Sequence, residues 1–219
     1  MNSLKPRINL EVLLVFSVTL LGLFGDPFTP SADSFHTVRW VDDGDTIVLA
    51  DGRRVRYTAI NTPEVAHEGR PAERFGPEAK ASNRKLVHEK KVRLEFDREK
   101  YDQYGRVLAY VFLQDGTFVN AELAKGGYAY YVFRRPNTKY NPLLLRLQRE
   151  AMAKGVGMWG GFADQKGPYL GNRHSRRFHQ MTCSFGKATS RKHLTTFKTK
   201  YDAFWAGYSP CKRCFRHGQ

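Results

Sequence analysis

Residues 35–64 read "FHTVRWVDDGDTIVLADGRRVRYTAINTPE" and contain three runs rich in β-branched and aromatic side chains. The dipeptides Asp43-Gly44 and Asp51-Gly52 separate these runs, and Asp-Gly is typical of tight turns between antiparallel strands. The stretch therefore predicts three meandering antiparallel strands at the start of a folded domain.

Further strands and helices are predicted after this meander. Strands are expected over 91–96 and 106–113, which are rich in apolar and β-branched residues. A helix is expected over 77–90, because proline at its start suits the first helical turn. A shorter helix is expected over 118–126 and ends at a glycine.

The segment 141–155 gives a clearer helical signal. Asn141 is expected to cap the helix, Pro142 to lie in its first turn and Gly155 to end it. Five short strands interleaved with helices in about 125 residues are typical of the oligonucleotide-binding fold, a five-stranded Greek-key barrel. The predicted fold class is mainly β with helices (α+β).

Composition divides the chain into four parts. Residues 1–34 are predicted to be a signal peptide or membrane anchor, and 35–160 the barrel domain. The glycine-rich run 155–168 marks the exit of this domain, so 161–170 is assigned to a linker. Residues 171–219 form a small basic module at the C-terminus.

The charge of the chain predicts a polyanionic partner. The 219 residues carry a formal net charge of +15. Residues 171–219 hold eleven Lys or Arg against the single acid Asp202, which places +10 in less than a quarter of the chain. Basic residues that replace condensed counterions on phosphates gain affinity without reading sequence. Nucleic acid is the first expected partner and anionic membrane the second.

The N-terminal segment resembles an export signal. Lys5 and Arg7 precede an apolar run over 8–24 that is slightly shorter than the roughly 20 residues of a membrane span. A cleaved signal with a cut near 32–34 and an uncleaved anchor are both open, and a buried first helix is a third interpretation. The expected location is secreted or extracytoplasmic, or membrane-anchored with the C-terminus outside.

A group of acids stands out in this basic chain. Asp42, Asp43 and Asp45 lie in "VDDGDT", and Glu64 follows in "NTPE". Hard cations such as Ca²⁺ are bound by several oxygens of this kind. On its own, the tetrapeptide DGDT is more often an ordinary β-turn than a metal site, so the other motifs of the chain must decide between the two.

Four motifs in order supply that pattern: "DDGDT", "RYTAINTPE", "RFGPEA" and "DQYGRVLAYVF". Together they resemble the staphylococcal-type nucleases, the thermonuclease family, over Phe35 to Gly160. The resemblance implies an oligonucleotide-binding barrel that cleaves DNA and RNA with Ca²⁺, breaks the P–O5′ bond and leaves 3′-phosphate ends.

The resemblance also implies a calcium site. Asp45 matches the metal aspartate, Asn61 the position of the second metal carboxylate, and Thr62 a residue that offers its backbone carbonyl. Asn61 departs from the commonest family pattern, because an amide removes one negative charge from the ion's ligands. Weaker calcium affinity with retained chemistry is expected, with Asp43 compensating in part.

The catalytic residues follow from the same motifs. Glu64 matches the glutamate that activates the attacking water, and Arg56 and Arg106 match the arginines on the scissile phosphate. Tyr104 matches an aromatic residue beside the substrate. A phosphodiester gains negative charge at the transition state, so guanidinium groups stabilise it and a carboxylate serves as general base.

The three cysteines of the chain lie near its C-terminus. His179 and Cys183 are separated by three residues, and Cys211 and Cys214 by two. Two such ligand pairs predict a tetrahedral Zn²⁺ site, which a domain of about 50 residues needs for stability. A Cys211–Cys214 disulfide with Cys183 free is the alternative in an exported protein.

Between the two ligand pairs, Thr199 and Asp202 form a predicted capping box that opens a short helix, which Gly207 ends. The run from residue 171 onward resembles the Ada-type metal-binding module that some exported nucleases of this family carry. This resemblance implies structural zinc, and the basic charge suggests a nucleic-acid tether. Three other histidines are expected on the surface: His174, His193 and His217.

The sequence thus predicts an exported or membrane-anchored, monomeric, calcium-dependent nuclease that acts on DNA or RNA, with no protein partner. One alternative is a catalytically weak or inactive barrel that binds nucleic acid at the cell surface. An anionic-membrane adaptor is a third hypothesis, which would need basic residues beside an exposed apolar helix face.

Overall fold

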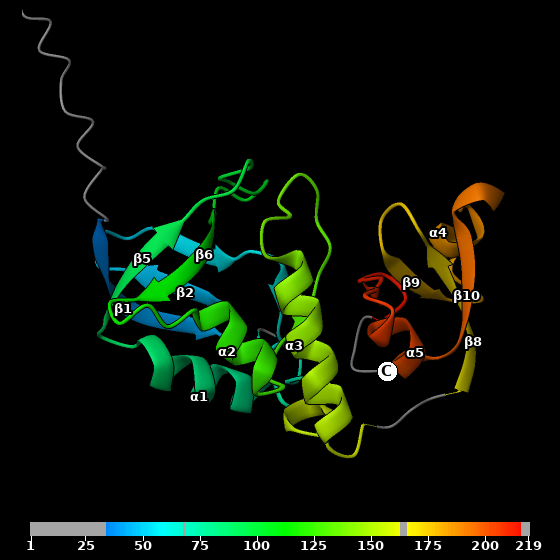
Figure 1. Cartoon of the computed structure of the whole chain (residues 1–219), viewed down its shortest axis with the longest axis horizontal. Coiled ribbons are helices and arrows are strands. Elements are labelled where there is room, and N and C mark those ends of the chain that lie inside the picture. Colours follow the sequence, from blue (N-terminus) through cyan, green and yellow to red (C-terminus); the bar gives the residue numbers. More distant parts are fainter. Residues whose placement is uncertain (1–33, 68, 163–165, 216–219) are drawn as a thin grey trace, which may run out of the picture. The chain divides into compact units, whose positions relative to one another are not determined.

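The N-terminal part of the fold is a closed barrel. The computed structural model describes residues 34–67, 69–162 and 166–215 (Figure 1). The barrel has the strand order β1-β2-β3-β6-β5, with β3 and β6 parallel and the other neighbours antiparallel. Its strands are β1 (Phe35–Asp43), β2 (Thr46–Leu49), β3 (Arg54–Tyr57), β5 (Lys91–Glu95) and β6 (Val107–Leu113). The predicted five-stranded barrel and the α+β class are confirmed.

Alternating apolar side chains fill the barrel. Ile47 and Leu49 of β2 and Val55 and Tyr57 of β3 are almost fully buried, whereas Arg56 between them is partly exposed. This period of two is what a strand with one inner face requires. In β6 all seven residues are buried, and the rings of Phe118 and Tyr140 pack against its Tyr110 and Phe112.

Three helices pack beside the strands: α1 (Gly76–Val87), α2 (Val119–Lys125) and α3 (Asn141–Lys154). The C-terminal stop of α3 is confirmed, since Gly155 has a left-handed φ of 61°. The predicted cap is wrong. Tyr140 occupies the cap position because its carbonyl accepts the first helical hydrogen bond from the amide of Leu144, and Asn141 is the first helical residue.

Buried amide side chains tie the loops to the barrel. Asn83 of α1 accepts a hydrogen bond from the Tyr57 hydroxyl at 2.9 Å and donates to the carbonyl of Asp43 at 3.1 Å. Asn120 of α2 accepts from the amide of Val111 and donates to the carbonyl of Thr58. Since unpaired buried polar groups are costly, these amides fix where α1 and α2 sit on the strands.

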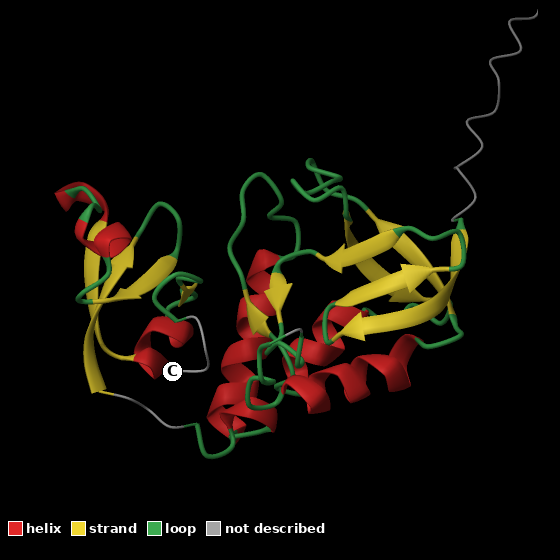
Figure 2. Ribbon diagram, turned by 180° about the vertical axis from the view of Figure 1, so that it is seen from behind, coloured by secondary structure: helices red, strands yellow, loops and turns green. Residues whose placement is uncertain are grey.

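The C-terminal part is a separate four-stranded sheet in the order β10-β8-β9-β11, drawn in yellow in Figure 2 beside short helices in red. Its elements are β8 (Lys166–Asn172), β9 (Arg177–Gln180), α4 (Ser184–Lys187), β10 (Leu194–Thr199), α5 (Lys200–Trp205) and β11 (Ser209–Pro210). Two single 3₁₀ turns occur at Gly157–Trp159 and Arg191–His193. Phe178 and Phe204 are buried at the centre of its apolar cluster.

Two details of this sheet bear on the sequence predictions. The capping box is confirmed: the Thr199 hydroxyl accepts from the Asp202 amide at 2.9 Å, and the Asp202 carboxylate accepts from the Thr199 amide. The linker assignment needs a correction, because β8 begins at Lys166. Tyr169 and Leu170 pair with both β9 and β10, so these residues belong to the sheet.

The predicted export segment lies outside the described residues, as does His217. Among the helices that the structure describes, none is long and apolar enough to span a membrane.

Candidate active site and candidate metal centre

Strand pairing gathers the predicted active-site residues at one edge of the barrel. Asp45 lies in the turn before β2, and Thr46 pairs with Arg56 of β3. Arg56 also pairs with Leu108 of the parallel strand β6, so Arg106 lies two residues before that position. Asn61 ends the short strand β4 (Ile60–Asn61), which pairs with β7 (Tyr130–Tyr131). The arrangement depends on long-range pairings rather than on sequence proximity.

Asp45 is the buried acid of this group. Its Oδ2 accepts from the backbone amide of Thr62 at 2.9 Å and forms an ion pair with Arg56 at 2.9 Å. Burial raises the pKa of Asp45 to about 7, Arg56 opposes this rise, and the carboxylates of Asp43 and Glu64 add to it. The site therefore holds more negative charge than Arg56 compensates.

The turn that carries Asp45 requires a glycine. A Cβ atom built on Gly44 would lie 2.6 Å from the hydroxyl oxygen of Thr62. Real Cβ atoms do not approach other atoms so closely, so only glycine lets the turn pack against Thr62. The "DDGDT" and "NTPE" motifs are therefore held together by direct packing.

Arg56 is almost fully engaged by protein acceptors. Nη1 donates to the carbonyls of Tyr57 (2.6 Å) and Ile60 (3.0 Å), and Nη2 to Oδ1 of Asn61 (2.8 Å). Its side chain is only 15% exposed. In this structure the guanidinium joins β3, β4 and Asp45, and a phosphate would have to replace some of these partners.

Glu64 is half-buried beside the start of α1. Its backbone amide donates to the Glu73 carboxylate at 3.1 Å, and its carbonyl accepts from the Glu73 amide at 2.9 Å. A Cβ atom on Gly76 would clash with the Glu64 carbonyl oxygen. Gly76 thus allows the helix to start directly against the backbone of Glu64.

Arg106 and Tyr104 lie on a more exposed loop. Asp102 organises this loop by accepting from the amides of Tyr104 and Arg106 and from the Arg106 guanidinium at 2.8 Å. Tyr104 is 74% exposed, and the guanidinium carbon of Arg106 lies 5.7 Å from the centre of its ring. No hydrogen bond or ion pair among the described residues joins Arg106 to Arg56 or Glu64.

The acidic site offers oxygen ligands that fit a hard cation. Asp43 and Asp45 contribute carboxylates and Thr62 a carbonyl, and a bound cation would lower the pKa of Asp45, which burial and then the neighbouring carboxylates raise. In the described parts of the chain, however, Asp43, Asp45 and Glu64 do not bring three ligand atoms to one point. Asn61 also turns its oxygen toward Arg56 and its nitrogen toward the Thr62 carbonyl, 2.7 Å away.

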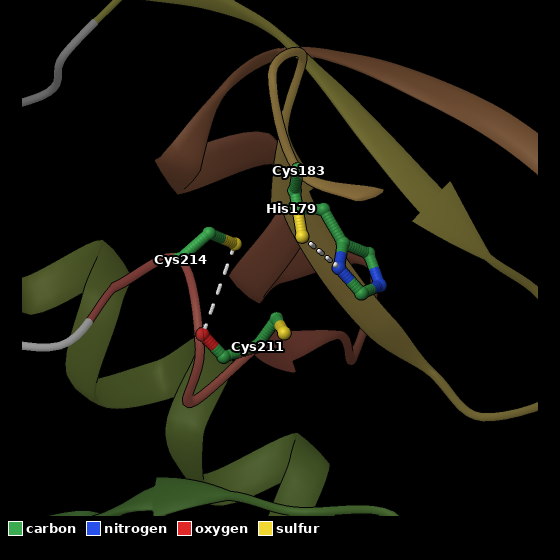
Figure 3. Close-up of side chains that lie close together, drawn as sticks. All are labelled: His179, Cys183, Cys211 and Cys214. Atoms are coloured by element: carbon green, nitrogen blue, oxygen red, sulfur yellow. Dashed lines mark hydrogen bonds between the residues drawn. The ribbon is translucent and has the colours of Figure 1, made fainter. Parts of the chain in front are cut away.

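The C-terminal module contains a compact group of soft ligands. One atom each from His179, Cys183, Cys211 and Cys214 lies within 4.8 Å of the others. Figure 3 shows these four side chains close together. The four ligands of a tetrahedral zinc ion lie about 3.5–3.8 Å apart, so this spacing fits. All three cysteines are free, and no disulfide forms among the described residues.

Local structure places these ligands. His179 lies in β9, and β11 pairs in parallel with β9, so the amide of Cys211 donates to the carbonyl of Phe178 at 2.9 Å. Cys183 precedes α4, and its Sγ lies 3.4 Å from Nδ1 of His179. The ligand pairs are thus joined by sheet pairing rather than by their own contacts alone.

The pKa shifts within the group act on metal binding in different directions. Burial and Arg177 lower the pKa of His179, which favours the neutral imidazole that binds metals. Burial raises the pKa of Cys214 to about 12, and the neighbouring cysteines add to this. Burial acts in the same direction on Cys183, but hydrogen bonds from the Gly186 amide and neighbouring groups lower its pKa overall. A cation would convert these thiols to thiolates.

Some site residues were not predicted. The Tyr130 hydroxyl accepts a hydrogen bond from Nδ2 of Asn61 at 3.0 Å, although 69 positions separate the two residues. Glu73 holds the backbone of Glu64, and Asp102 holds Arg106. Asp102 could have been found from the sequence, because it lies in the polar loop "DQYGR" and aspartate often accepts hydrogen bonds from the backbone of a turn. Nothing in the sequence around Tyr130 indicated its contact with Asn61.

Comparisons with known proteins show the family to which the barrel belongs. The family described as "Staphylococcal nuclease homologue" matches residues 54–161. The thermonuclease of Staphylococcus intermedius is 40% identical over 152 residues, which cover 68% of this chain and 90% of that protein. The thermonuclease of Staphylococcus hyicus is 38% identical over 122 residues (54% and 72%), and endonuclease YncB of Bacillus subtilis 38% over 137 residues (60% and 62%).

The barrel with its acidic and arginine-bearing edge, together with these relatives, defines the chain as a nuclease, a hydrolase of nucleic acids. The chain belongs to the staphylococcal nuclease family. The family match ends at residue 161, so the Ada-type resemblance of residues 171–219 stays a prediction.

Proposed function

We propose that the chain is a calcium-dependent nuclease that hydrolyses phosphodiester bonds of DNA and RNA and leaves 3′-phosphate ends. The proposal rests mainly on one observation: the buried Asp45 carboxylate forms an ion pair with Arg56, and the carboxylates of Asp43 and Glu64 are near enough to raise its pKa. Such a site combines uncompensated negative charge for a cation with a guanidinium for a phosphate.

Glu64 is assigned the role of general base. Its carboxylate takes a proton from water, the resulting hydroxide attacks phosphorus, and the P–O5′ bond breaks. The departing 5′ oxygen takes up a proton, which leaves a 5′-hydroxyl and a 3′-phosphate. Arg56 and Arg106 stabilise the added negative charge on the phosphate oxygens, and Tyr104 contacts the substrate beside them.

Asp45, the Thr62 carbonyl and Asn61 are the proposed ligands of calcium, with Asp43 close by. When bound, calcium supplies positive charge that stabilises the phosphate at the transition state. His179, Cys183, Cys211 and Cys214 are proposed to hold structural zinc, which the ligand spacing supports.

The function can be tested with plasmid DNA and RNA and the full chain. Chelation with EDTA should stop cleavage, and added Ca²⁺ should restore it. The Glu64→Gln variant should lose about 10²- to 10⁴-fold in rate, the usual contribution of a general base, and should still bind the strand. Glu89→Gln is a matched control, because it removes the same charge from a side chain that is 83% exposed.

An inactive nucleic-acid-binding barrel at the cell surface predicts the opposite result. That hypothesis requires binding without calcium-restored cleavage in the same assay. Equal loss of binding and cleavage in Glu64→Gln would indicate misfolding rather than loss of the base.

Export and a monomeric state remain part of the proposal. Lys5, Arg7 and the apolar run over 8–24 support passage across a membrane. Fractionation of expressing cells and the N-terminal sequence of the product will distinguish a cleaved signal from a membrane anchor. A cytoplasmic product with an intact N-terminus would contradict export.

A further inference from the structure

A cavity of about 380 Å³ opens on the C-terminal module, outside the proposed catalytic site. It lies between β9, the start of α4 and the turn that follows β11. Two of the proposed zinc ligands, His179 and Cys211, also line it, so the cavity adjoins the metal centre. Three of its lining residues are basic: Arg177, Lys212 and Arg213. The exposed ring of Phe185 forms part of its wall.

The cavity has cations but no acid. Between Lys166 and Phe215 the only acidic residue is Asp202, whose carboxylate is occupied in the capping box. Within the described residues, no carboxylate lies within ion-pair distance of Arg177, Lys212 or Arg213. The three charges at this site are therefore not balanced by carboxylates of the module.

Arg177 is one of these cations without a carboxylate partner among the described residues. Its Nη1 donates to the Ser209 hydroxyl at 2.7 Å and to the carbonyl of Pro210 at 3.4 Å, which are neutral acceptors. A partly buried cation whose hydrogen-bond acceptors are neutral is costly, and an anion that enters the cavity would offset that cost. Zinc held by three thiolates and a neutral imidazole carries a charge of −1, so the three cations keep an excess of about +2.

The aromatic wall adds a second kind of contact. Phe185 is 48% exposed, and the guanidinium carbon of Arg213 lies 4.4 Å from the centre of its ring. Exposed aromatic rings beside basic side chains are the usual platform for an unpaired nucleobase, since every base has a flat face and its phosphates are anionic. A bare inorganic anion would leave Phe185 unused.

We propose that this cavity binds one nucleotide unit of a nucleic-acid strand, with its phosphate on Arg177, Lys212 and Arg213 and its base on Phe185. The inference rests on the proposed nuclease function and adds a place where the substrate is held apart from the bond that is cut. The ligand class is a single-stranded polynucleotide, in which bases are free to stack.

Binding to a fluorescein-labelled single-stranded oligonucleotide tests this site. Fluorescence anisotropy is measured without calcium, on the full zinc-loaded chain carrying Glu64→Gln, so that no strand is cut. The double variant Lys212→Ala/Arg213→Ala should weaken binding about tenfold. It should also lower the slope of log affinity against log salt by about 1.4, the value for two phosphate contacts on a single strand.

A separate variant tests the aromatic contact. Phe185→Ala should weaken binding at least about fivefold with an unchanged salt slope, because base stacking is worth about 1–3 kcal/mol and is not ionic. Phe185 lies outside the turn between Cys211 and Cys214. Phe185 does follow Cys183 by two residues, but the substitution changes only its side chain and keeps the amide that faces the Cys183 thiol. Metal analysis of both variants will show whether each one keeps its zinc.

The matched control is Lys192→Ala/Lys198→Ala. Both lysines are exposed on the same module, neither lines the cavity, and the charge change is identical. Equal effects of the two double variants, or no effect of Phe185→Ala, would overturn the site in favour of diffuse attraction. Loss of binding to anionic lipid vesicles with unchanged oligonucleotide binding would instead assign the cavity to a membrane. Calcium-dependent cleavage by the unmodified chain tests the proposed function independently.

Discussion

The side-chain nitrogen of Asn61 donates a hydrogen bond to the backbone carbonyl of Thr62 over 2.7 Å. Both residues are proposed calcium ligands, so in this structure the Thr62 carbonyl already accepts a hydrogen bond from the side chain of the other ligand. The amide orientation is fixed from two sides, because Oδ1 of Asn61 faces the Arg56 guanidinium and Nδ2 also faces the Tyr130 hydroxyl. A cation at this site must compete with these hydrogen bonds, and Asn61 supplies no negative charge to attract it. Both effects weaken calcium binding.

The substitution Asn61→Asp should therefore strengthen calcium binding for two reasons. It adds a carboxylate to the ligands, and it removes the amide donor from the Thr62 carbonyl. The calcium concentration for half-maximal cleavage should fall by about fivefold or more, since ligand charge is a main determinant of affinity. Calcium titrations of cleavage rate will measure this shift.

Asn61→Ser is the control for that substitution, because it also removes the amide but adds no charge. An unchanged calcium requirement in Asn61→Asp would show that residue 61 does not contact the ion. A similar gain in both variants would mean that the hydrogen bond to Thr62, rather than the charge, limits binding.

Gly76→Ala should reduce both stability and catalytic rate. Its methyl group would clash with the carbonyl oxygen of Glu64, and this backbone contact cannot relax without moving the proposed base. Overpacking of this kind costs about 1–3 kcal/mol of unfolding free energy. Thermal unfolding and kcat are measured on the same samples, at a temperature where the variant is folded.

Gly116→Ala provides the comparison. Gly116 has φ of 86° and open space around it, so alanine there strains the backbone without touching the site. It should lower stability and leave the kcat of the folded protein unchanged. If Gly76→Ala also kept its full kcat, Gly76 would matter for folding but not for the position of Glu64.

Asp102→Asn should expose a pH-dependent part of the stability. Burial on its own raises the pKa of Asp102, but hydrogen bonds from the Arg106 side chain and amide and from the Tyr104 amide lower it overall. A lowered folded-state pKa stabilises the protein above the unfolded pKa of about 3.9. This stabilisation is lost as the pH falls through the folded-state value.

The variant should be about 1–3 kcal/mol less stable than the unmodified chain at pH 7, the usual cost of losing charged hydrogen bonds. The difference should shrink as the pH falls below the unfolded value of about 3.9 and through the lowered folded-state pKa of Asp102, because the Asp102 side chain then becomes neutral as well. Thermal unfolding of both proteins from pH 2.5 to 7 measures it. A difference that stays constant with pH would mean that the Asp102 charge contributes nothing.

Local chemistry made much of the fold predictable. The Asp-Gly turns, the Thr199 capping box and the stop at Gly155 each depend on a few neighbouring residues. The start of β8 and the cap of α3 did not follow from such signals. Lys166 joins the sheet through partners far along the chain, and Tyr140 became the cap although its side chain offers no acceptor for it.

The same distinction applies to the site. The acidic and arginine residues could be named from the sequence, because the motifs that carry them are continuous. The hydrogen-bond partners of Arg56 and Asn61 could not be predicted from the sequence. They depend on the parallel pairing of β3 with β6 and on Tyr130 from another strand. Side-chain orientation in a hydrogen-bond network is set by all of its members together.

The His/Cys group should hold one metal ion that stabilises the C-terminal module. His179→Ala and Cys211→Ser each remove one of four ligands and should reduce zinc from about one ion per chain to well below one. Hydrogen exchange should then become faster in β8, β9 and α5, because this small sheet depends on the ion for stability. His174→Ala is the matched control, since His174 is exposed and lies outside the group; it should keep its zinc. Full zinc content in both His179→Ala and Cys211→Ser would exclude a metal at these residues.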